Sequence, residues 1–265
     1  MKKVFFIALT LSFLSLVLIF PEGVKKGVEL SLSLCARSLL PSLFPFMVLS
    51  NFVIKSGILP PSPFILGAVG GYPLGAQVVC DLYEKSRITK GDAEIALCYS
   101  SLPSPGFVLG AIGGIYGFKK AIFLITFNLL SALFLRIFAT KIKVEKSASV
   151  PFSAAFSIGV KDAFFSFLVV CSFVIFFSII CEVLGCFWDV PVFLRGVLEM
   201  SGGVFSRPSF PLAAFFVSFG GACVHAQISA LCTLCGLSCK KHFISKLFIG
   251  VLSAIFAYSL TFFDI

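Results

Sequence analysis

The sequence predicts an all-α, polytopic integral membrane protein. Of its 265 residues, 58% are hydrophobic and only 12% are charged, and the mean hydropathy is +1.07. A soluble domain is nearer half apolar and a quarter charged, so much of this apolar surface requires lipid as its solvent. At about 20 residues per span, the length provides for roughly six to eight membrane segments.

The charge of the chain indicates which partners to expect. The formal net charge is +9, from 21 Lys+Arg against 12 Asp+Glu. In a membrane protein, basic loops that face the cytoplasm and anionic lipid account for such an excess. No basic stripe interleaved with aromatic residues occurs, so we predict no nucleic-acid partner. The expected partners are the lipid bilayer and a small-molecule solute, with a coupling proton, Na⁺ and a homo-oligomer left open.

Residues 1–26 are predicted to form an N-terminal membrane span that the protein retains. Two lysines precede 17 uncharged, mostly apolar residues. The apolar run ends in Ile19-Phe20-Pro21-Glu22, without the small-x-small pattern at which a signal peptide is cleaved. The expected location is therefore a cell membrane, which the chain crosses several times.

Residues 27–147 and 148–265 are predicted to form two repeats with the same order of elements. Each begins with a long apolar segment, continues with two segments broken by Gly, Ser or Pro, and closes with an uninterrupted span. In the first repeat these are 28–54, 67–77, 95–114 and 121–139, and in the second 156–185, 195–211, 218–230 and 247–263.

Two further features of the first repeat predict its local structure. Pro41 and Pro45 lie inside its long apolar segment and are expected to kink or break a helix. The polar stretch 81–94 is expected to be an interfacial helix and turn.

The basic residues predict that the two repeats have opposite directions in the membrane. Lys2, Lys3 and the basic cluster at 136–146 are expected inside, so the span 121–139 runs inward. Lysines at 240, 241 and 246 place the start of the last span inside, so that span runs outward. Equivalent spans of opposite direction indicate inverted-topology repeats, although Lys25 and Lys26 fall on the outer side in this scheme.

The breaks predict a substrate site. Irregular backbone at membrane depth survives only inside protein or along a wet cavity, and paired broken helices of inverted repeats mark the substrate site of transporters. Half-helix N-termini suit carboxylate or phosphate, and half-helix C-termini suit a cation. The predicted substrate-binding residues are Gly70, Gly71, Tyr72, Pro73, Ser100, Ser101, Pro103, Ser104, Glu199, Ser201, Gly202, Gly203, Gly220, Gly221, His225 and Gln227.

Each of these residue types also has a structural explanation. Glycines spaced four apart, as at 67, 71 and 75, make a smooth stripe for close helix packing without any ligand. Glu199 could hold a coupling proton, a cation or a polar group of the solute, or it could lie at the membrane edge. His225 could serve the solute or a proton, or it could make a hydrogen bond between helices.

Metal and enzyme chemistry have little support in the sequence. Cys232, Cys235 and Cys239, followed by His242, have a spacing that could hold zinc or an iron–sulfur cluster, but the three cysteines also form one apolar helix face. We predict no metal and no cofactor. The chain has two histidines and neither a G-x-S-x-G nor an H-E-x-x-H motif, so we predict that it is not an enzyme.

Five motifs resemble the sporulation integral membrane protein family, whose members carry two nucleoside-recognition (Gate) domains. They are SLLPSLFPFMVLS (38–50), GGYPLGA (70–76), KGDAEIALCYSS with the prolines that follow (90–105), LEMSGG (198–203) and FGGACVHAQ (219–227). Where the family tends to have Asn-Asn-Ser-Gly-Pro, this chain has Tyr-Ser-Ser-Leu-Pro at 99–103, which keeps hydroxyls but loses the amides.

The resemblance implies a function. Gate domains also occur in concentrative nucleoside transporters, which place substrate between broken helices, and dipicolinate is the proposed cargo of the sporulation family. We therefore expect a membrane transporter for a small polar, anionic solute, similar to the dicarboxylate dipicolinate, that acts in sporulation. The alternative is a scaffold component of spore formation that transports nothing.

Overall fold

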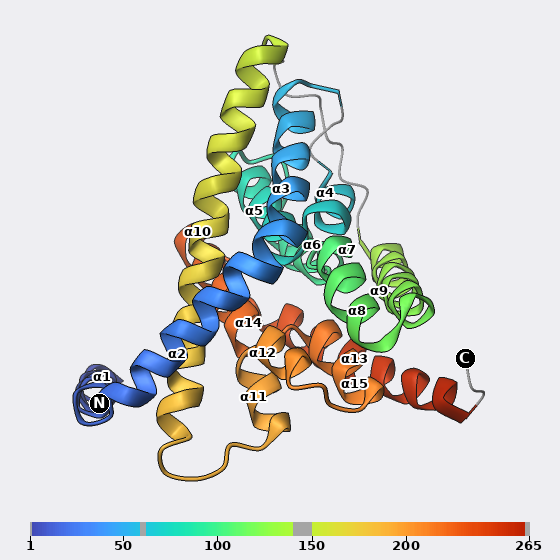
Figure 1. Cartoon of the computed structure of the whole chain (residues 1–265). Coiled ribbons are helices and arrows are strands. Elements are labelled where there is room, and N and C mark those ends of the chain that lie inside the picture. Colours follow the sequence, from blue (N-terminus) through green and yellow to red (C-terminus); the bar gives the residue numbers. More distant parts are fainter. Residues whose placement is uncertain (1, 59–61, 140–149, 263–265) are drawn as a thin grey trace.

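The regular elements of the described residues are all helices. The computed structural model describes residues 2–58, 62–139 and 150–262. Its first part contains α1 (Lys2–Ile19), α2 (Pro21–Leu34), the π-helical turn η1 (Cys35–Leu39), α3 (Leu40–Lys55), α4 (Pro63–Gly70), α5 (Tyr72–Glu84), α6 (Lys90–Ser100), α7 (Pro105–Phe107), η2 (Val108–Ile112), α8 (Gly113–Tyr116) and α9 (Phe118–Ile137). Its second part contains α10 (Phe152–Leu184), α11 (Val192–Leu198), α12 (Met200–Phe205), α13 (Phe210–Phe219), α14 (Gly221–Cys235) and α15 (Lys240–Phe262) (Figure 1).

Six segments of the described chain are long and apolar enough to cross a membrane. Their ranges are Pro21–Lys55, Lys90–Tyr116, Phe118–Ile137, Phe152–Leu184, Phe210–Cys235 and Lys240–Thr261. Large apolar side chains such as Leu130, Phe134 and Phe248 are about 60% exposed on the outside of this bundle, as lipid-facing residues would be. The predicted all-α polytopic membrane fold is confirmed.

The two interrupted segments lie in the interior of the protein. In 90–116 and 210–235, 72% and 61% of the most apolar window is buried, against 17–28% in the other four segments. A broken helix has backbone groups that lipid cannot satisfy, so these segments have to be surrounded by protein.

The second part of the chain repeats the element order of the first. A long helical segment (α2–α3 or α10) precedes a broken pair (α4–α5 or α11–α12), a second broken segment (α6–α8 or α13–α14) and an unbroken helix (α9 or α15). The two long segments pack against each other, with Gly159 of α10 against the backbone of Phe52 in α3.

One lysine used for the orientation argument was wrongly assigned. Lys246 is not in a loop but lies in the second turn of α15 with 1% of its surface exposed, so it cannot be counted as a loop charge. Lys141, Lys143 and Lys146 of the other basic cluster lie outside the described residues.

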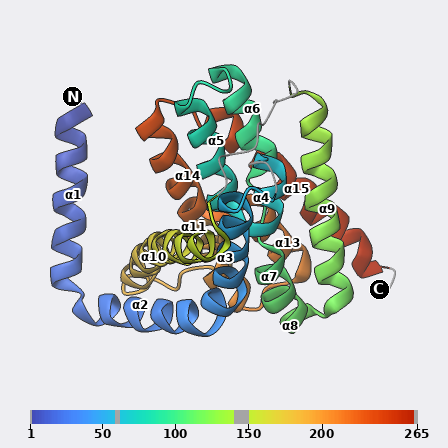
Figure 2. The same cartoon turned by 90° about the horizontal axis from the view of Figure 1, so that it is seen from above.

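Of the two prolines expected to kink or break a helix, Pro41 lies where the helical path is interrupted, whereas Pro45 lies inside the continuous helix α3. Pro41 has no N–H to offer the carbonyl of Arg37, and the chain forms the π-helical turn η1 immediately before this proline. The path turns between α2 and α3 at this point, as Figures 1 and 2 show.

Helix α1 lies at one side of the helical bundle (Figure 2). It ends at Ile19, and α2 begins at Pro21 in a new direction, so residues 21–26 belong to the second helix and not to the first. Phe13 packs against Phe176 of α10, with ring centroids 5.3 Å apart.

The polar stretch 81–94 forms a helix end, a turn and a helix start. α5 ends at Glu84, and α6 begins after Thr89, whose hydroxyl accepts a 3.2 Å hydrogen bond from the backbone N–H of Asp92. Such a cap satisfies one of the free N–H groups of the first turn. The turn brings α6 back alongside α5, which places the two breaks of the first part next to each other.

Candidate functional site

The two breaks of the first part meet at Gly71 and Ser104. Gly71 joins α4 to α5 with φ +89°, a conformation that favours glycine, and a Cβ there would lie 3.0 Å from the Cβ of Ser104. On either side, a Cβ at Gly67 or Gly75 would overlap the carbonyl oxygen of Ser100. Gly67 and Gly75 therefore allow close helix packing, and Gly71 forms the break.

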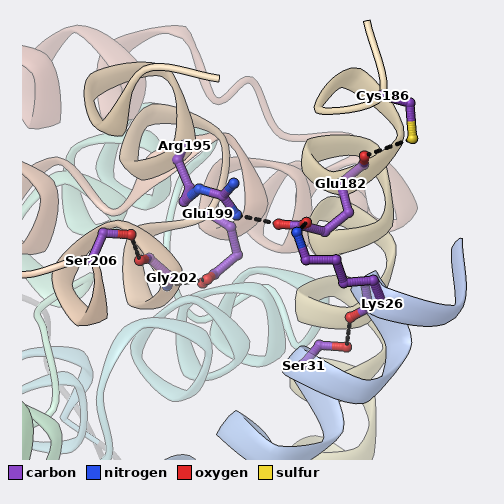
Figure 3. A network of polar contacts seen from close by, with 9 residues as sticks. Lys26, Ser31, Glu182, Cys186, Arg195, Glu199, Gly202 and Ser206 are labelled. Atoms are coloured by element: carbon purple, nitrogen blue, oxygen red, sulfur yellow. Dashed lines mark hydrogen bonds and ion pairs between the residues drawn. The ribbon is translucent and has the colours of Figure 1, made fainter. Parts of the chain in front are cut away.

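The first break of the second part is formed by Glu199. Its backbone is extended between α11 and α12, and its carboxylate accepts hydrogen bonds from the N–H groups of Ser201 (2.9 Å) and Gly202 (2.5 Å) (Figure 3). Only 3% of Glu199 is exposed, so its carboxylate lies in the interior of the protein. The carboxylate caps α12 and occupies the N-terminus of that helix.

The second break of the second part lies against the first. Gly220 (φ +91°) and Gly221 (φ +70°) separate α13 from α14. A Cβ on Gly221 would lie 3.2 Å from the carbonyl oxygen of Gly196, and one on Gly203 would overlap Gly196 itself. The short pair α11–α12 therefore packs closely on the start of α14.

Side chains from each part cap the broken helices of the other. The Tyr72 hydroxyl donates to the carbonyl oxygen of Val217 (2.5 Å) and lies 3.3 Å from that of Ser218, in the last turn of α13. Nδ1 of His242 lies 3.2 Å from the carbonyl oxygen of Leu97, in the last turn of α6. Carbonyls of a last turn have no partner within their helix, so the two parts satisfy each other's broken ends.

A small cavity of about 40 Å³ lies between the breaks of both parts, and we call it the central cavity. Seven of the predicted site residues line it: Gly70, Tyr72, Pro73, Ser104, Glu199, Ser201 and Gln227. Most of the remaining wall is apolar, with Met47, Phe107 and Val170 among its residues. The structure thus brings together polar groups from three of the four breaks, with Gln227 from α14.

The other predicted site residues lie around this cavity without lining it. Gly71, Ser100, Ser101 and Pro103 belong to the breaks of the first part, Gly203, Gly220 and Gly221 pack helices of the second part, and Gly202 faces a different pocket.

His225 faces away from the central cavity. It lies against Phe219 and Phe243, with ring centroids 4.7 and 4.9 Å away, and lines an outer pocket. Its Nε2 atom is buried and has no hydrogen-bond partner among the described residues.

The sequence analysis missed two buried charged residues and one buried asparagine. Lys246 lies with its Nζ atom 5.7 Å from the centroid of the Tyr72 ring and forms no ion pair with any described carboxylate. Asn128 donates to Ser218 (3.0 Å) beside the end of α13. An ionisable residue within an apolar segment is itself a signal of function, and it could have indicated Lys246.

Glu182 is the second charged residue that was missed. It is 5% exposed near the end of α10, where it pairs with Lys26 (2.7 Å) and with Arg195, as Figure 3 shows. These contacts hold α2, α10 and α11 together at one end. The position of Glu182 in a long apolar run carried the same signal as Lys246.

The cysteine cluster forms no metal centre in the described part of the chain. No group of three or more His, Cys, Asp or Glu side chains there could hold a metal ion. Cys235 instead lies with its Sγ atom 3.2 Å from that of Cys80, and Cys232 is buried in the helix interface.

Comparison with known proteins supports the assignment of the chain as a membrane protein. No family model and no solved structure matches the chain. The chain is similar to a sporulation protein. The sporulation integral membrane protein YlbJ of Bacillus subtilis (strain 168) is 23% identical over an alignment of 336 positions, which covers 95% of this chain and 80% of the relative. With its six candidate spans, the chain is a multi-pass integral membrane protein.

Proposed function

We propose that the protein moves a small polar, anionic solute across a membrane during sporulation. The observation that carries this proposal is the central cavity, because broken helices from both parts of the chain meet there. The similarity to a sporulation integral membrane protein supports the cellular process. The Gate-domain resemblance supports a substrate site between broken helices.

Buried polar groups around the cavity support a polar ligand. The hydroxyl oxygens of Ser100, Ser101 and Ser104 are buried and have no hydrogen-bond partner among the described residues. A buried hydroxyl without a partner is costly, and native structures supply one from protein, water or ligand. Ser104 lines the cavity, so its hydroxyl is available to a solute.

The location of positive charge restricts how an anion could bind. We expected carboxylates at the half-helix N-termini, but the N-terminus of α12 already holds the carboxylate of Glu199. An anionic solute would meet this carboxylate and not free N–H groups there. The solute's charge therefore has to be balanced elsewhere, and Lys246 behind Tyr72 is one such group.

A thermal-shift screen of purified protein tests the proposal. Dicarboxylates, including dipicolinate, and nucleosides would be added in turn, because a ligand of the native state stabilises it by about 2.7 kcal/mol at a concentration of 100 Kd. We expect a dicarboxylate to raise Tm and neutral analogues to have no effect. If no compound raises Tm and Glu199→Gln leaves sporulation unchanged, the scaffold alternative replaces the transporter.

A further inference from the structure

A second pocket lies on the other side of α12 from the central cavity. It has a volume of about 350 Å³ and is walled by residues of α2, η1, α10, α11 and α12, with Ser206 just after α12. Ser201 of α12 faces the central cavity, whereas Gly202 of the same short helix and Ser206, which follows it, face this pocket. We call it the arginine pocket, because Arg37 of η1 and Arg195 of α11 both line it.

The pocket carries an excess of positive charge. Its one described acidic residue is Glu182, which already pairs with Arg195 and with Lys26 (Figure 3). Arg37 forms no ion pair with any described carboxylate. Two arginines and one glutamate give the pocket lining a net charge of +1, and the nearby Lys26 adds another positive charge. Such a surplus beside apolar walls attracts an anion.

Hydroxyl donors accompany the two guanidinium groups. Ser31 and Ser206 donate to carbonyls of their own helices, at 2.6 and 2.8 Å. Ser33, Ser38 and Ser178 also line the pocket, and their hydroxyls have no acceptor among the described residues. These three hydroxyls and the two guanidinium groups give the pocket more hydrogen-bond donors than acceptors. A carboxylate or phosphate, whose oxygens accept hydrogen bonds, suits such a pocket.

We propose that the arginine pocket binds a small free dicarboxylate, with one carboxylate on Arg37 and the other on Arg195. A guanidinium group holds a carboxylate through two parallel hydrogen bonds, and Glu182 fixes the orientation of Arg195. The identity of the ligand rests on the proposed function. Only α12 separates the arginine pocket from the central cavity, so the same solute would reach both. The phosphate of a lipid headgroup has related chemistry, and the experiment separates the two.

The experiment measures equilibrium binding of radiolabelled dipicolinate to the full-length protein in phosphatidylcholine nanodiscs. We expect saturable binding that Arg37→Gln weakens by about tenfold or more, because one charge-assisted pair is lost. Arg37→Lys keeps the charge but not the planar fork, so its affinity should lie between the two. Arg207→Gln makes the same change at an exposed arginine that lines neither cavity, and it should bind as the parent does.

Three results would overturn the assignment. They are no saturable binding to the parent protein, equal binding by Arg37→Gln and the parent, and loss of dipicolinate binding when phosphatidylglycerol replaces part of the phosphatidylcholine. The last would make a lipid headgroup the occupant. Flux in proteoliposomes separates this inference from the proposed function: if Arg37→Gln carries dipicolinate with the KM of the parent, transport stands and the arginine pocket does not bind the solute.

Discussion

The hydroxyl of Tyr72 donates a 2.5 Å hydrogen bond to the carbonyl oxygen of Val217, 145 residues away in the sequence. Tyr72 is the first residue after one break, and Val217 lies in the last turn before another. His242 makes the reciprocal contact with Leu97 in α6, also across 145 residues. Each part of the chain thus supplies the side chain that completes a broken helix of the other, which couples the two parts at the central cavity.

Removal of the Tyr72 hydroxyl should destabilise the protein. Tyr72→Phe leaves the Val217 carbonyl buried without a donor, at a cost of about 1–3 kcal/mol. Tyr83→Phe is the matched control, since Tyr83 lies in the same helix, is half-buried and donates no hydrogen bond to another described residue. Thermal unfolding in detergent compares them. Equal stability of the two variants would show that the contact across the breaks contributes nothing.

Lys246→Met should reduce transport without lowering the stability of the protein. Lys246 has no carboxylate partner among the described residues, so an apolar side chain of similar length in place of its buried charge should not lower the stability. Transport should nevertheless fall, because an ionisable group inside a membrane protein is kept for function and this one lies behind the cavity residue Tyr72. Lys119→Met, at an exposed position, is the control for flux and for stability. Unchanged flux in Lys246→Met would assign Lys246 a structural role.

Glu182→Gln should loosen the contact between α2, α10 and α11. Its partner Lys26 is mostly exposed and adds little, but Arg195 is more enclosed, so we expect a loss of about 1–3 kcal/mol. Asp162→Asn tests an ion pair on the same helix, because Asp162 pairs with Lys55 at 3.0 Å with both side chains about 40% exposed. That variant should lose less than about 1 kcal/mol, as exposed pairs do. The reverse order of the two losses would contradict this account of the cluster.

Two glycine-to-alanine variants test the close packing around the break at Gly71. Gly67→Ala places a methyl group on the Ser100 carbonyl, and the required shift should cost about 1–3 kcal/mol or more. Gly114→Ala meets nothing within 4 Å in α8 and should stabilise the helix by about 0.5–1 kcal/mol. Chemical unfolding measures both. If both variants were stabilised, the predicted overlap with Ser100 would be wrong.

The breaks could be predicted from the sequence because their residues have strong local effects. Gly71 followed by Pro73, the Ser-Ser-Leu-Pro run at 100–103 and the Gly-Gly pair at 220–221 all disfavour continuous helix. The repeated order of interrupted segments was readable for the same reason.

The partners of the buried side chains could not be predicted in this way. The contacts of Tyr72 and His242 join residues far apart in the sequence, and only the packing of the helices selects them. Lys246 was taken for a loop residue because Lys240 and Lys241 precede it closely. A count of basic residues cannot tell an exposed lysine in the first turn of a helix from a buried one in the next turn.

Flux of dipicolinate into proteoliposomes tests the central claim most directly. We expect saturable uptake by the parent protein that is lost in Tyr72→Phe combined with Ser104→Ala, two changes inside the central cavity, and kept in Tyr83→Phe. Size-exclusion profiles of the variants would exclude misfolding as the cause. Uptake no greater than in empty liposomes, or uptake that the cavity variants leave unchanged, would contradict the account.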